Sequence, residues 1–272
     1  MDLGLTGKVA LVAGGSSGLG LAVATELAAE GARVAIGARD PDRLAAARRA
    51  VPAIAHSSTV DVTDLDAARA WVDRVAADLG ALHIVVSGGG GPPTGTAAGF
   101  DVEEYRAAVD TVLLPAVNLA LAALPHLRTA GWGRLLFITS ESAGVSVAQL
   151  ALSGVARAGI VRFAQSLAAD VGTEGITVNV LAPGATRTPL VERGAAKLAG
   201  AGGDVEAQLT EMGRHTALRR IARVDEFGAF AAFLASERAS YVTGAVHLLD
   251  GGASVLGHES SHLRNASKDT FR

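Results

Sequence analysis

The chain has 272 residues, a formal net charge of −3, 49% hydrophobic residues and no cysteine. This length can bury the core of one large α/β domain, while the lack of cysteine excludes disulfides and thiolate metal sites. The slightly acidic charge argues against nucleic acid or an anionic membrane as a partner. No apolar run reaches the ~18 residues of a spanning helix, and the N-terminus carries no secretory pattern, so we expect a cytoplasmic protein.

The first predicted unit is a strand, a glycine-rich turn and a helix. Residues 9–13 form an apolar run typical of a buried strand, and residues 21–29 are rich in Ala and Leu at helical spacing. Between them the glycines follow the spacing G-x-x-x-G-x-G. Such a turn places backbone N–H groups at a helix N-terminus, where a phosphate is favoured and glycine allows a close approach. We therefore predict a dinucleotide site with contacts from Gly14, Ser16, Ser17, Gly18, Leu19 and Gly20.

The chain then alternates between strand and helix patterns. Short apolar runs predict strands at 33–38, 56–60, 83–86, 134–138, 177–181 and 245–249. Helical spacing predicts helices at 41–50, 64–79, 103–128, 149–171 and 225–235. Asp40 and Pro41 are typical of an N-cap and a first helical turn, and Pro115 predicts a kink in the long helix. This alternation indicates α/β architecture, a doubly wound parallel sheet of about seven strands in a single Rossmann-like domain over residues 1–252.

Two segments stand apart from this alternation. Residues 188–216 are rich in glycine and charge, and we expect them to form a mobile lid, irregular or helical. Residues 253–272 are polar without periodicity and are interpreted as a C-terminal tail. The tail contains His258-Glu-Ser-Ser-His262, which has the spelling of a zinc-protease motif. Since it offers no buried helix and no third ligand, we expect no metal site.

Ligands of such sheets bind beyond the carboxyl ends of the strands, and several motifs stand there. They are the pair Asp61-Val62, the glycine run that ends in Gly-Gly-Pro-Pro at 90–93, Asn179-x-x-Ala-Pro183-Gly184, Tyr241-Val-Thr-Gly244 and Asp250-Gly-Gly252. Together with the glycine turn, this ordered set resembles the short-chain dehydrogenase/reductase family over nearly the whole chain. It is most similar to the acyl-carrier-protein ketoreductase-like members that carry Gly-Gly-Pro-Pro after the fourth strand.

The resemblance implies a nicotinamide cofactor. It places Asp61 and Val62 at the adenine and Thr188 at the carboxamide, with further contacts from Gly88, Gly89, Arg157, Pro183, Gly184 and Thr186. At the end of the second strand, Arg39 stands where an acidic residue would accept the ribose hydroxyls and select NAD. A guanidinium suits a ribose phosphate by charge and by planar donor geometry, so we expect NADPH to be preferred over NADH.

The catalytic half departs from the family pattern. Ser140 stands at the family's serine, but Ser153 replaces its tyrosine and Arg157 its lysine, giving Ser-x-x-x-Arg in place of Tyr-x-x-x-Lys. The family's asparagine position falls on Val112 or within one residue of it, and no asparagine stands there. A serine hydroxyl is much less acidic than a phenol, and arginine does not deprotonate in proteins. We take Ser140, Ser153 and Arg157 as candidate catalytic groups that would hold an oxyanion, with Glu141 as a weaker candidate acid.

These observations leave three functions open. The first is an NADP-binding oxidoreductase that acts on a carbonyl or alcohol of a small molecule with an atypical site that lacks the tyrosine. The others are a non-redox enzyme of the same fold, such as an isomerase, cyclase or dehydratase, and a pseudoenzyme that binds cofactor without turnover. By resemblance we also expect a homotetramer, with an interface formed by the long helix and the helix that contains Gly154 and Gly159.

Overall fold

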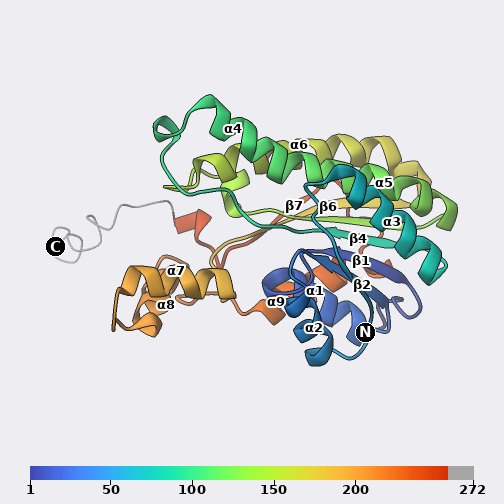
Figure 1. Cartoon of the computed structure of the whole chain (residues 1–272), viewed down its shortest axis with the longest axis horizontal. Helices are drawn as coiled ribbons and strands as arrows, with labels where there is room; N and C mark the ends of the chain where they lie inside the picture. Colours follow the sequence, from blue (N-terminus) through green and yellow to red (C-terminus); the bar gives the residue numbers. More distant parts are fainter. Residues whose placement is uncertain (257–272) are drawn as a thin grey trace, which may run out of the picture.

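The computed structural model describes residues 1–256 (Figure 1). Its centre is one parallel sheet of seven strands in the order β3-β2-β1-β4-β5-β6-β7. The strands are β1 Val9–Ala13, β2 Arg33–Ala38, β3 Ile54–Thr59, β4 Ile84–Ser87, β5 Gly133–Ile138, β6 Ile176–Pro183 and β7 Val246–Leu249. The order reverses direction between β1 and β4, which places the carboxyl ends of these two strands on either side of a crevice. The predicted doubly wound sheet is confirmed.

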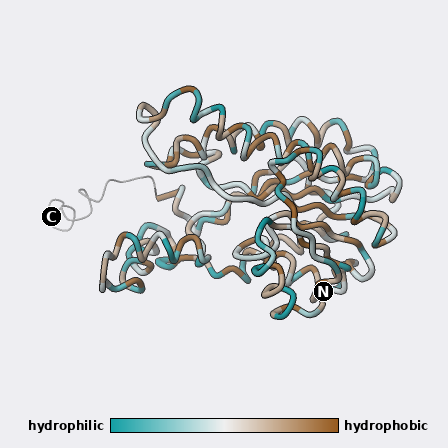
Figure 2. The backbone as a smooth tube through the Cα atoms, viewed as in Figure 1, coloured by the Kyte–Doolittle hydropathy of each residue, from teal (hydrophilic) through white to brown (hydrophobic). Residues whose placement is uncertain are grey.

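Helices cover both faces of the sheet. The main ones are α1 Gly18–Ala29, α2 Pro41–Ala50, α3 Leu65–Leu79, α5 Leu114–Ala130, α6 Ala151–Val171 and α9 Val224–Leu234. One layer consists of α3, α5 and α6 and the other of α1, α2 and α9 (Figure 1). Each layer buries its own apolar cluster, with Trp71 fully buried in the first and Phe227 in the second. Apolar segments accordingly run along the strands in Figure 2.

The long helix predicted over 103–128 is divided in the structure. It consists of α4 Val102–Ala108, a π-helical turn at Val109–Leu113 and α5. The wide turn comes directly before Pro115, which has no N–H to donate and whose ring crowds the preceding turn. This turn also fits α6, because a Cβ on Gly159 would stand only 2.8 Å from the Leu113 side chain. Gly159 therefore allows close packing within the chain itself.

By length and composition alone, residues 102–130 form the one helical stretch of the described chain that could cross a membrane. Its α5 portion instead packs against α3 and the sheet, and Leu119, Ala123 and Leu127 are fully buried there. This packing is that of a core helix.

The segment predicted as a lid forms two helices, α7 Pro189–Ala199 and α8 Val205–Arg214. They pack on each other and project from the main body near the carboxyl ends of the strands (Figure 1). Leu190 and Leu198 on α7 remain 65% and 72% exposed. The pair therefore presents an uncovered apolar surface close to the predicted ligand site.

Candidate functional site

The glycine turn between β1 and α1 is built by close backbone contacts. Gly14 has a left-handed backbone with φ of +70° and donates its N–H to the Gly37 carbonyl at 2.9 Å. A Cβ on Gly20 would lie 2.8 Å from the Gly14 carbonyl carbon and closer still to its oxygen. Ser17 precedes α1 in an extended conformation and makes no side-chain cap. The first N–H groups of α1 are thus left for a ligand, and the helix dipole favours an anion there.

The opposite wall of this turn is the glycine run after β4. A Cβ on Gly14 would approach the Gly88 carbonyl at 3.1 Å, whereas one on Gly89 or Gly90 would meet nothing within 4 Å. Thr188, the N-cap of α7, lies beside Gly18, whose added Cβ would stand 3.5 Å from the threonine side chain. The structure therefore brings the predicted phosphate turn, the glycine run and Thr188 around one open cradle. The uncapped N–H groups of this cradle fit an anionic phosphate, as a dinucleotide carries.

Two charged residues, Arg39 and Asp61, follow the carboxyl ends of the paired strands β2 and β3. Arg39 is exposed after β2. The pKa of the Asp61 carboxyl is lowered chiefly by the hydrogen bond from the Thr63 N–H and to a smaller extent by the positive charge of Arg39. Asp61 also accepts the Thr63 hydroxyl at 2.9 Å. The nearest carboxylate to Arg39 in sequence, Asp40, accepts the N–H groups of Asp42 and Arg43 as the predicted N-cap of α2. Asp40 is thus committed to the helix, while Arg39 forms no ion pair within residues 1–256.

The segment after β6 is held by hydrogen bonds to β7 and within itself. The Gly184 N–H donates to the Leu249 carbonyl at 3.1 Å, and Thr186 is buried, with its hydroxyl donating to the Gly184 carbonyl at 3.3 Å. A Cβ on Gly184 would stand 3.0 Å from a carboxylate oxygen of Glu141. Glu141 therefore reaches the Pro183–Gly184 corner.

A row of polar side chains connects α6 to the glycine run. Arg157 donates to the Ser153 hydroxyl at 2.5 Å and to the Gly90 carbonyl at 3.4 Å. The hydroxyls of Ser153 and Ser142 lie 3.2 Å apart, and both residues are buried. Ser140 is engaged differently, since its side-chain oxygen accepts the Ser142 N–H. Ser153 and Arg157 come together as neighbours one helical turn apart, and the serine that joins them is Ser142.

Sequence reasoning missed Ser142. Its two-residue distance from Ser140 was the only local signal, and its contact with Ser153 depends on how the β5–α6 loop folds back. Gly154 permits that fold, because a Cβ there would stand 3.0 Å from the Ser142 carbonyl oxygen. Burial lowers the pKa of the Arg157 guanidinium, which nevertheless stays protonated as arginine does in proteins. The row is therefore a positive site able to hold an oxyanion.

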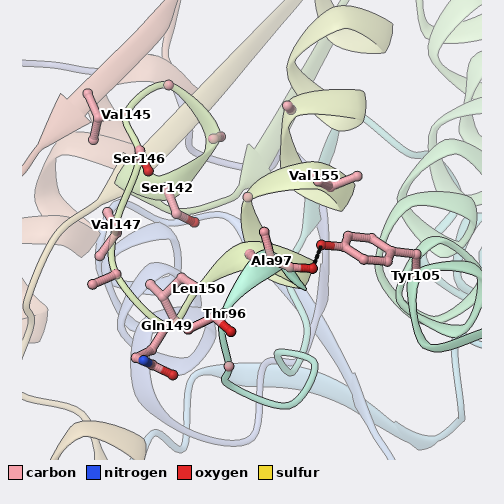
Figure 3. Close-up of a pocket in the computed structure, with 17 residues that line it drawn as sticks. Thr96, Ala97, Tyr105, Ser142, Val145, Ser146, Val147, Gln149, Leu150 and Val155 are labelled. Carbon is pink, nitrogen blue, oxygen red and sulfur yellow. Dashed lines mark hydrogen bonds between the residues drawn. The ribbon is translucent and has the colours of Figure 1, made fainter. Parts of the chain in front are cut away.

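A cavity of about 570 Å³ adjoins this row (Figure 3). Its walls come from the β4–α4 loop, Tyr105 of α4, the β5–α6 loop and the first turns of α6, and Ser142 lies in its lining. Val145 and Val147 stand on one side, with Tyr105 and Val155 on the other (Figure 3). Of the two tyrosines, Tyr241 is fully exposed and Tyr105 donates its hydroxyl to the Ala97 carbonyl at 3.0 Å.

Within residues 1–256 no group of three or more His, Asp or Glu side chains is arranged to hold a metal ion. The motif His258-Glu-Ser-Ser-His262 lies outside the described residues.

Comparison with known proteins identifies the family. The family model described as enoyl-(acyl carrier protein) reductase matches residues 13–254. The chain is 36% identical over 252 residues to cis-4-hydroxycyclohexanecarboxylate dehydrogenase of Sinomonas cyclohexanicum, covering 92% of this chain and 97% of that protein. The protein belongs to the short-chain dehydrogenase/reductase family. Its relatives include D-threitol dehydrogenase of Mycolicibacterium smegmatis, 31% identical over 93% of this chain and 95% of that one.

Solved structures agree with this assignment. L-sorbose reductase of Gluconobacter frateurii, determined with NADPH and L-sorbose, superposes with a TM-score of 0.89 at 32% identity, covering 93% of this chain and 98% of that chain. These relatives are dehydrogenases and a reductase. The chain therefore resembles the family's oxidoreductases in both sequence and fold.

Proposed function

We propose that the protein is an oxidoreductase that uses NADP(H) to interconvert a carbonyl and an alcohol on a small molecule. The observation that carries this proposal is the cradle between α1 and the Gly88–Gly90 run, where N–H groups at a helix N-terminus are left uncapped beside open space. The dehydrogenase relatives and the NADPH complex of L-sorbose reductase support it. When bound, the nicotinamide would supply or accept the hydride.

The preference for NADPH over NADH rests on two neighbouring residues. Arg39 offers an exposed guanidinium at the end of β2, and planar donor pairs of this kind bind phosphate strongly. The Asp40 carboxylate, the kind of group that accepts ribose hydroxyls, is instead held by two N–H groups of α2 and by Arg43 at 3.1 Å. The cofactor contacts expected from Asp61, Val62, Pro183, Gly184, Thr186 and Thr188 remain part of this proposal.

The test is a pair of fluorescence titrations with NADPH and NADH. Arg39→Ala should weaken NADPH binding at least tenfold and leave NADH binding within twofold, because only NADPH carries the extra phosphate; a charge-assisted hydrogen bond contributes about 1.5–3 kcal/mol. Arg48→Ala removes the same charge from the exposed last turn of α2 and serves as the matched control. Equal affinities of the wild type for both cofactors would refute the assignment.

In this proposal the row Ser142–Ser153–Arg157 performs the work that tyrosine and lysine do elsewhere in the family. Arg157 holds the Ser153 hydroxyl and places a fixed positive charge beside an oxygen that becomes negative during the reaction. Ser142 and Ser153 can pass a proton between hydroxyls, but neither is an acid near neutral pH. We therefore propose slow proton exchange and weak turnover of generic ketones, with Glu141 at the Gly184 corner as the alternative acid.

Consumption of NADPH with a panel of ketones decides between the functions. Turnover of any ketone supports the oxidoreductase. NADPH binding without turnover would favour the pseudoenzyme or a non-redox reaction in the same pocket, which the loss of a phenol acid also suits.

We further propose a homotetramer that forms through the outer faces of α5 and α6, where Leu114 and Leu121 of α5 are exposed by 39% and 51%. The glycines of α6 do not add to that interface, since Gly154 and Gly159 contact this chain's own Ser142 and Leu113. A light-scattering mass of one subunit would contradict it. The cytoplasmic location stays a prediction from the N-terminal sequence.

A further inference from the structure

The cavity beside Ser142 is large enough to bind a small molecule. Its volume of about 570 Å³ lies within the ~300–1,000 Å³ typical of ligand sites. The lining residues come from the β4–α4 loop, α4, the β5–α6 loop and α6, and they are aliphatic or uncharged polar apart from the aromatic Tyr105. No Asp, Glu, His, Lys or Arg stands among those that the structure describes. A charged group on a bound ligand would therefore meet no opposite charge in this lining.

The cavity and the positive row lie on different sides of α6. Ala151, Gly154, Val155 and Ala158 face the cavity at helical spacing, whereas Ser153 bonds Arg157 on another face. Ser142 belongs to both, since it lies in the cavity wall and stands 3.2 Å from the Ser153 hydroxyl. It is the polar contact through which a ligand in the cavity would reach the row.

The wall that carries this contact is held in a costly conformation. Gln149 has a left-handed backbone with φ of 64°, which non-glycine residues rarely adopt. Its carbonyl accepts the Gly95 N–H at 2.8 Å, which ties the β5–α6 loop to the β4–α4 loop across the cavity. A strained backbone of this kind persists only where the surrounding structure holds it, and such residues cluster at binding sites.

We propose that this cavity selects an uncharged substrate with an aliphatic or alicyclic body, whose carbonyl or hydroxyl oxygen meets Ser142. The inference rests on the proposed function for the reacting group, but the selection itself is a property of the cavity. A carboxylate or phosphate on the body would lie against the apolar side chains of Val147, Leu150 and Val155 with no cation in the lining, which disfavours binding. Arg157 does not neutralise such an anion, since its side chain lies outside the lining and is hydrogen-bonded to Ser153 and Gly90.

The experiment compares two isosteric probes by calorimetry, with and without NADPH. One is cyclohexanone that carries an isopropyl group opposite the carbonyl, and the other carries a carboxylate in that place. We expect the isopropyl ketone to bind at least tenfold more tightly. Val155→Lys adds a cation at the half-exposed rim and should reduce that ratio at least tenfold, whereas Val155→Met, an uncharged change at the same site, should leave it within about twofold.

The outcomes separate this inference from the proposed function. Equal binding of the probes, tighter binding of the carboxylate, or no binding of either at millimolar concentration overturns the inference, whatever NADPH does. Discrimination by a protein that fails to bind NADPH upholds the cavity's selectivity and refutes the cofactor assignment instead. An unchanged ratio in Val155→Lys, with an unaltered thermal melt, would show that selection arises elsewhere and would also overturn the inference.

Discussion

Gly20→Ala should damage both stability and cofactor binding, because the new methyl group meets backbone. It would lie 2.8 Å from the Gly14 carbonyl carbon, well inside the ~3.5–4.0 Å of an ordinary carbon contact. No rotamer change relieves a contact between a Cβ and a neighbouring turn, so we take the upper part of the ~1–3 kcal/mol that overpacking costs. Alanine is more favourable than glycine within a helix such as α1 by about 1 kcal/mol, which offsets part of that cost. The expected net loss is about 1–2 kcal/mol of unfolding free energy.

Urea titration measures this loss, and a fluorescence titration with NADPH should show at least tenfold weaker binding, since the turn that shifts is the cradle itself. Gly172→Ala is the matched control. Its φ of −58° suits alanine, and an added Cβ would meet nothing within 4 Å. It should stabilise the protein by about 0.4–1 kcal/mol and leave NADPH binding unchanged. Wild-type stability and wild-type binding in Gly20→Ala would refute the description of the turn as a tight backbone cradle.

Two other perturbations test the catalytic row and the sheet. Ser153→Tyr combined with Arg157→Lys should raise ketone turnover by up to about 10²–10⁴, the contribution of a positioned acid; no gain despite intact folding would show that the acid lies elsewhere, and Glu141→Gln would then be examined. Burial lowers the pKa of His83, whose Nδ1 accepts the Val9 N–H at 3.0 Å. Because the unfolded chain binds the proton first, unfolding free energy should fall below about pH 6.5, by at most about 1.4 kcal/mol per pH unit. Urea titrations of wild type and His83→Gln at several pH values check this. Equal slopes of unfolding free energy against pH in the two proteins would contradict it.

Much of the fold followed from short-range patterns in the sequence. The apolar run at 9–13, the glycine turn and the helix after it are neighbours in the chain, and their geometry depends on local backbone preferences. Asp40 and Pro41 likewise mark the start of α2 through a cap that spans three residues. The third strand was less well defined, expected at 56–60 and found at Ile54–Thr59, because its residues are largely polar and it forms the edge of the sheet.

The site depended on contacts that only the tertiary structure could decide. Ser142 meets Ser153 because the β5–α6 loop folds back over Gly154, and no spacing rule distinguishes it from Ser140. Gly159 was expected to permit the close approach of another helix, and the tertiary structure decides that this neighbour is Leu113 in the wide turn ahead of α5. Local sequence fixes which φ and ψ values a residue can adopt, whereas the direction of a side chain toward a partner far along the chain depends on how whole elements pack. For that reason the glycine cradle could be read from the sequence, and the hydroxyl–guanidinium row and its cavity could not.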